Sequence, residues 1–135
     1  MINDLIGKSF SDDPVLAYGP DFYSCYGLLV EVFKRYGIEI PKVNIAVLAC
    51  ENASNREIEK RAALEWEEIK EPEVPCGVLI RSSTPGFANH IGIYIGKNRM
   101  IHIVLKRNVV VDRLSDWKHK IIGYYKYVGN SNNNI

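Results

Sequence analysis

The sequence has no marked excess of charge of either sign and no long hydrophobic run. Its 135 residues include 17 lysines and arginines against 16 aspartates and glutamates, a net charge of +1. This balance gives no reason to expect nucleic acid or a membrane as a partner, and the apolar runs are too short to span a bilayer. Residues 1–4 lack the basic and apolar regions of a secretory signal, so we expect synthesis for the cytoplasm, or exit by a route that needs no amino-terminal signal.

Cysteine is scarce, with only Cys25, Cys50 and Cys76 in the chain. The odd count, the wide spacing and the lack of a C-x-x-C pair argue against a disulfide framework and a zinc knuckle. At least one thiol must therefore be free, and no structural metal is expected.

The chain also lacks internal repeats and linkers, so we expect one domain over residues 1–128 and a frayed, asparagine-rich tail over 129–135. Apolar periodicity predicts a helix over 24–36, with Ser24 or Asp21 as its N-cap and Gly37 as its stop. A capping-box pattern starts a second predicted helix over 54–70.

After residue 75 the hydrophobic period changes to that of β-strands. Gly96-Lys97-Asn98 is a hairpin signal between the second and third strands. Helices followed by short strands with tight turns predict an α+β fold, with the helices packed on an antiparallel sheet of about five strands. These strands are expected at 77–80, 90–95, 100–105, 109–111 and 121–128.

Cys25 falls at the start of the first predicted helix. The unpaired N–H groups of a first helical turn stabilise a thiolate, which favours a nucleophilic role. The alternative is a small buried hydrophobe, the usual fate of a free cysteine. Cys50, in an apolar run, and Cys76, beside Pro75, have no comparable placement and are interpreted as structural.

A nucleophilic cysteine needs an imidazole base and a group that orients the base. His90 and His102 have their midpoint at Gly96, so a hairpin folded there would set the rings opposite each other on one face. A simple two-residue turn would put them on opposite faces, so this interpretation requires an odd loop or a β-bulge. The alternative for each ring is a satisfied or surface side chain, as we expect for His119.

The segments "YGPDFYSCYGLLVEVFKRYGIEIP" and "NHIGIYIGKNRMIHI" together carry a family resemblance. They resemble the NlpC/p60 family, papain-like cysteine peptidases of bacterial cell walls. The helix start, the histidine strand and the second histidine occur in the family's order, and the resemblance spans about residues 6–128. It looks closest to the type encoded by phages and prophages beside tail-assembly genes.

The resemblance implies a papain-like NlpC/p60 fold in which Cys25 is the nucleophile, His90 the general base and His102 its orienting residue. It implies hydrolysis, through a thioester, of an amide in the peptidoglycan stem peptide, between D-γ-glutamyl and a diamino acid. The cysteine and imidazole supply nucleophile and acid, so no cofactor is implied. Phage tail proteins are the further partners, which would make the chain virion-associated and active at the cell wall.

The resemblance also implies substrate contacts at Tyr18, Ser24 and Tyr26. Many members have aspartate at the position of Ser24, where it holds the substrate's free amine, so recognition of that amine is in question here. The aspartate of the family's P-G-D block is missing as well, at Cys76-Gly77. Two other functions stay open, a non-catalytic assembly or binding module with this fold and thiol acyl chemistry on another substrate.

Overall fold

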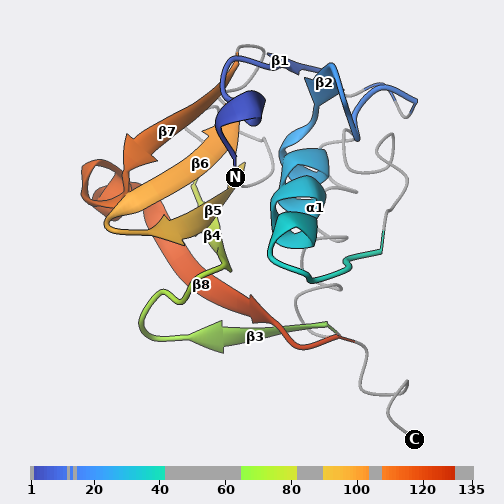
Figure 1. Ribbon diagram of the computed structural model, residues 1–135. Coiled ribbons are helices and arrows are strands. Elements are labelled where there is room, and N and C mark those ends of the chain that lie inside the picture. The colour runs from blue at the N-terminus through green and yellow to red at the C-terminus, as the bar shows by residue number, and fades with distance from the viewer. Residues whose placement is uncertain are drawn as a thin grey trace, which may run out of the picture.

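A helix packed on one face of an antiparallel sheet forms the body of the protein (Figure 1). The structure, a computed structural model, describes residues 2–11, 13, 15–41, 65–81, 90–103 and 108–129. No helix within these ranges is long and apolar enough to cross a membrane. In chain order the elements are η1 (Asn3–Leu5), β1 (Ser9–Phe10), β2 (Phe22–Tyr23), α1 (Cys25–Arg35), β3 (Trp66–Ile69), β4 (Cys76–Ile80), β5 (His90–Gly96), β6 (Arg99–Ile103), β7 (Val109–Arg113), η2 (Leu114–Lys120) and β8 (Ile121–Tyr127).

The helix α1 confirms the first predicted helix and both of its end signals. The Ser24 side chain accepts a hydrogen bond from the Gly27 N–H and caps the first turn. At the other end Gly37 takes a φ of 83°, a left-handed conformation that glycine adopts without strain. The apolar stripe of the helix is fully buried, as Leu28, Val32 and Phe33 show.

The main sheet has six strands in the described part of the chain, in the order β3-β8-β4-β5-β6-β7, and every neighbouring pair is antiparallel. The α+β architecture and the antiparallel sheet are therefore as predicted. The strands expected from residue 77 onward correspond to β4 to β8, and β3 is an additional strand. A short parallel pair, β1 and β2, joins the amino-terminal segment to the chain just before α1.

The β5–β6 hairpin combines a two-residue turn with a β-bulge. Lys97 and Asn98 form the turn with φ values of 53° and 60°, the left-handed pair that suits a tight hairpin. The register shifts between Tyr94 and Gly96, which leaves one extra residue on β5. This bulge is the device that the histidine interpretation required, because it restores both rings to one face of the sheet.

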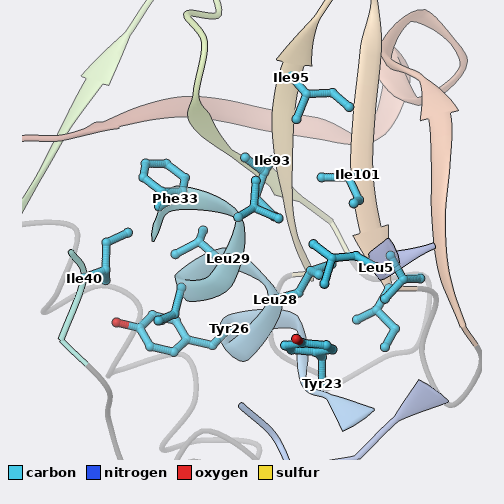
Figure 2. Packing of buried hydrophobic residues seen from close by; sticks show 14 of the residues in the cluster. Leu5, Tyr23, Tyr26, Leu28, Leu29, Phe33, Ile40, Ile93, Ile95 and Ile101 are labelled. Atoms are coloured by element: carbon cyan, nitrogen blue, oxygen red, sulfur yellow. The ribbon is translucent and has the colours of Figure 1, made fainter. Parts of the chain in front are cut away.

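The two faces of the sheet pack against different partners. Toward α1, isoleucines of β5 and β6 join Leu28, Leu29 and Phe33 in the main core (Figure 2). On the other face a smaller cluster forms around Val78, Met100 and Leu114, against which Trp117 of η2 packs. The main core holds α1 against the beginning of β5, which is where the candidate site lies.

One element differs from its prediction. The predicted helix over 54–70 is wrong at its end, because Trp66–Ile69 is the strand β3, paired with β8 from Trp66↔Tyr127 to Ile69↔Tyr124. Trp66 packs edge-on against Phe33 and Tyr127, with ring centroids 5.5 and 5.1 Å apart. Backbone pairing with β8 and this aromatic packing outweigh the helical spacing of the apolar residues. Residues 54–64 of that prediction lie outside the described residues.

Candidate active site

Cys25 is held at the first position of α1 by the residues around it. Ser24 is 6% exposed, and its hydroxyl oxygen accepts from the Gly27 N–H at 2.9 Å. The Ser24 N–H donates to the Ala17 carbonyl, also at 2.9 Å. Gly27 has no side chain, and this lets the Ala17 carbonyl approach the first turn of the helix. The cap and the close approach together fix where the cysteine sits.

The Cys25 side chain is half-buried against the main core, over the beginning of β5. Burial raises the pKa of its thiol. Three backbone N–H groups act in the other direction by stabilising the thiolate: that of Ile91 and, at the helix start, those of Cys25 and Tyr26. The helix start thus favours the thiolate as predicted, but burial outweighs it, and the resting group is a thiol.

A chain of hydrogen bonds runs from β5 across β6 to β7. His90 Nε2 lies 2.9 Å from His102 Nδ1, and His102 Nε2 lies 2.8 Å from Asp112 Oδ2. The Trp117 indole N–H donates to the same carboxylate oxygen at 3.1 Å. A carboxylate only accepts, so His102 carries its hydrogen on Nε2 and accepts from the His90 Nε2–H. His90 then presents Nδ1, an unprotonated ring nitrogen, as a base.

Gly92 makes room for this chain. The prediction that His90 and His102 stand directly opposite each other is wrong. The β5–β6 register pairs Ile93 with Ile101, which makes the two histidines diagonal neighbours on one face. A methyl at Gly92 would lie 3.3 Å from the His102 Cβ and 2.7 Å from the Met100 sulfur. Because that position has no side chain, the two rings can approach across the diagonal.

The two rings are uncharged at neutral pH. Burial, and to a smaller extent the neighbouring His102, lower the pKa of His90 to about 3. Burial also lowers the pKa of His102, although the hydrogen bond and the charge of Asp112 act against this shift. His102 is fully buried, and both of its ring nitrogens have partners, so it is a satisfied polar group within the sheet.

The sequence predictions missed Asp112 and Trp117. Asp112 interrupts the apolar run "VVVDR" at a position that alternation places on the face of Met100 and His102, and this was the available signal. The contact of Trp117 depends on the return of η2 across the sheet, where its ring meets the edge of His102 at a centroid distance of 4.9 Å. No sequence spacing indicates that contact.

The three predicted substrate residues have different surroundings. Tyr18 is half-buried and forms an isolated bridge with Tyr23, next to the Ala17 carbonyl that receives Ser24. Ser24 is buried as the helix cap. Tyr26 is 8% exposed, and its hydroxyl donates to the Pro41 carbonyl at 2.8 Å, so its side chain lies in the core rather than at a surface (Figure 2).

Cys76 and His119 lie apart from this site. Cys76 on β4 is fully buried, and burial raises the pKa of its thiol to about 11, in keeping with a structural role. His119 is exposed on η2, as predicted. The prediction for Cys50 falls outside the described residues. Within those residues, no group of three or more histidine, cysteine or acidic side chains is placed to hold a metal ion.

Solved structures with the same arrangement of helix and sheet define the class of this fold. The chain resembles NlpC2 from Trichomonas vaginalis with a TM-score of 0.60 and 15% identity, over 93% of this chain and 43% of that one. It resembles a protein described as similar to a lipoprotein of the NLP/P60 family, from Staphylococcus aureus subsp. aureus Mu50, with a TM-score of 0.56 and 20% identity. That match covers 93% of this chain and 38% of the other. The chain spans about two-fifths of the length of these proteins.

A match in sequence shows to which family the chain belongs. The model of the NlpC/P60 family matches residues 16–126, and the chain belongs to this family. The family consists generally of cell-wall peptidases. Among curated proteins no match was found. The matched range contains Cys25, His90, His102 and Asp112.

Proposed function

We propose that this chain is a cysteine hydrolase that cleaves an amide bond in bacterial cell-wall stem peptides, of the D-γ-glutamyl–diamino acid type. The hydrogen-bonded pair of His90 and His102 carries the proposal. His90 lies at the beginning of β5, next to Ile91, whose N–H reaches the Cys25 thiol, and His102 lies on β6. A nucleophile, a base and a group that orients the base are the parts that acyl transfer through a thioester requires.

The proposed reaction begins with proton transfer from the Cys25 thiol to His90 Nδ1 as the sulfur attacks the substrate carbonyl. His102 keeps the His90 ring in place by accepting its Nε2–H. The developing oxyanion accepts from the Cys25 backbone N–H at the helix start. His90 then protonates the leaving amine, and it later removes a proton from the water that hydrolyses the thioester.

Ser24 bears on which substrate is taken. Its hydroxyl is buried and engaged with the Gly27 N–H. An uncharged capping group offers no carboxylate to the ammonium of a free substrate amine, a charge-assisted contact worth about 1.5–3 kcal/mol. We therefore propose that a free amino terminus is not required and that Tyr18, beside the capped helix start, contacts the substrate. Stem peptides with free and acetylated amino termini should be cleaved at similar rates, and a strong preference for the free amine would contradict this.

Incubation with purified muropeptides tests the activity. The wild-type protein should release cleaved stem peptides, detected by mass spectrometry, whereas Cys25→Ala and His90→Ala should release none. His119→Ala is the matched control, because it removes an exposed imidazole outside the hydrogen-bond chain, and it should cleave normally. Identical products from the wild type and Cys25→Ala would refute the hydrolase and favour the non-catalytic binding module.

The phage-tail setting and cytoplasmic synthesis stay predictions from the sequence. Thiol acyl chemistry on an ester or a protein glutamine is the remaining alternative. It would be indicated by Cys25-dependent turnover of such a substrate with none of the muropeptides.

A further inference from the structure

Asp112 is a fourth side chain of the candidate site, and the reaction proposed above assigns it no role. It lies on β7, one strand beyond His102, with His102 Nε2 at 2.8 Å and the Trp117 Nε1–H at 3.1 Å on the same oxygen. Its side chain is 38% exposed, while the His102 ring that it contacts is fully buried. The hydrogen-bond chain therefore runs from the interior of the sheet to a negative charge at the surface.

That charge matters at one stage of the proposed reaction. When the Cys25 proton reaches His90, a positive charge appears on a ring enclosed by protein, which is unfavourable unless an anion lies nearby. The thiolate is one such anion, but it is consumed as the carbon–sulfur bond forms. The His90 Nε2–H already points at His102 Nδ1, so the positive charge can be shared through His102 with Asp112.

Among the described residues, the other groups packed around the rings offer no second anion. On β4, the residue paired with His90 is Ile80. From η2 the neighbour is Trp117, with the Lys120 ammonium 5.7 Å from its ring centroid. From α1 the group nearest in the chain of contacts is Cys25, whose thiol meets the N–H of Ile91, the residue after His90. In the described part of the chain, Asp112 is the only carboxylate whose charge acts on either ring.

We propose that Asp112 is a positioning residue that fixes the tautomer of His102 and balances the charge of the protonated histidine pair, so that a proton from Cys25 can be held on His90. This rests on the proposed function, because it assigns a role within the same thiol–imidazole site. Trp117 supports it by holding the carboxylate oxygen toward His102 through its indole N–H.

Asp112→Asn separates charge from geometry. The asparagine carbonyl oxygen can accept from both His102 Nε2–H and Trp117 Nε1–H, so the shape of the chain is kept and only the negative charge is lost. A hydrogen bond to a charged acceptor is roughly twice as strong as one to a neutral acceptor. We therefore expect the loss of the charge to slow the reaction of Cys25 at neutral pH about tenfold. Asp116→Asn is the matched control, since Asp116 is exposed on η2 and pairs with Arg113 instead.

The measurement is the rate of Cys25 alkylation by iodoacetamide from pH 5 to 10, mapped by mass spectrometry. In Asp112→Asn the rate at pH 7 should fall about tenfold, and the whole profile should move about one unit to higher pH. Asp116→Asn should overlay the wild type, and Asp112→Glu should restore part of the loss. Alkylation needs no cell-wall substrate, so this result stands or falls separately from muropeptide cleavage.

A wild-type profile in folded Asp112→Asn would overturn the proposal. So would a shift seen in Asp112→Leu but not in Asp112→Asn, because the residue would then act only as a hydrogen-bond holder. If Asp112→Asn does not fold, nitrogen-15 NMR of the wild type decides. The proposal requires His102 to carry its hydrogen on Nε2, and a hydrogen on Nδ1 would refute it.

Discussion

Replacing Gly27 by alanine tests how closely the Ala17 segment packs against the start of α1. Alanine is the better helix former, but its methyl group would meet the Ala17 backbone. A methyl at this position would lie 1.9 Å from the Ala17 carbonyl oxygen and 2.9 Å from the carbonyl carbon. Both atoms are backbone, so the Ala17 segment has to move away from the helix. The same carbonyl accepts the Ser24 N–H, and that bond would be disturbed as well.

The expected magnitude follows from three contributions. Overpacking costs about 1–3 kcal/mol, and a disturbed hydrogen bond costs about 1 kcal/mol. Alanine gains about 1 kcal/mol over glycine within a helix. We therefore expect the free energy of unfolding to fall by about 2 kcal/mol, which for a chain of this length is roughly 8 °C in Tm.

Urea unfolding followed by circular dichroism measures this, with Gly77→Ala as the control. At Gly77 the nearest atoms to a new methyl lie 3.6–3.7 Å away, an ordinary contact, so that variant should stay within about 0.5 kcal/mol of the wild type. If Gly27→Ala proved as stable as the wild type, or more stable, the close packing of Ala17 on the helix start would be refuted.

Three further predictions concern the site. Ser24→Ala should lower the free energy of unfolding by about 1 kcal/mol through loss of the helix cap, and Ser24→Asp should not; equal loss in both would argue against capping. Stability should fall as pH drops from 6.5 toward 3, because the unfolded chain binds a proton at His90 that the folded chain, with a pKa of about 3, does not. Between pH 7 and 5 the free energy of unfolding should fall by about 1 kcal/mol, after discounting for partial exposure of the ring. Urea titrations of His90→Asn should show a smaller dependence of stability on pH. The same dependence in the variant and the wild type would contradict this prediction. Gly92→Ala should lower stability by only about 1 kcal/mol, because Met100 can move, yet slow Cys25 alkylation by displacing His102; an unaltered rate would show that the rings do not need this space.

The local signals in the sequence predicted the elements well wherever an element is specified by its own residues. The stripe from Leu28 to Phe33, the cap at Ser24 and the stop at Gly37 describe α1 completely. The alternation of β5 and the turn at Lys97-Asn98 were readable for the same reason. The end of the second predicted helix was wrong because Trp66–Ile69 takes its hydrogen bonds from β8, some sixty residues away, and no local period reports a distant strand.

For the site, sequence alone determined the type and order of the chemical groups: a cysteine at a helix start, a histidine at a strand start and a second histidine across a hairpin. Only the tertiary structure decided how they are connected. The bulge before Gly96 put both rings on one face, and the pairing of β6 with β7 brought Asp112 to His102. Burial then keeps Cys25 a thiol, although the helix start alone would favour a thiolate, and it keeps the His90 ring uncharged. Helix starts and turns are encoded by neighbouring residues, whereas register, burial and charge balance come from segments that meet only in the folded chain.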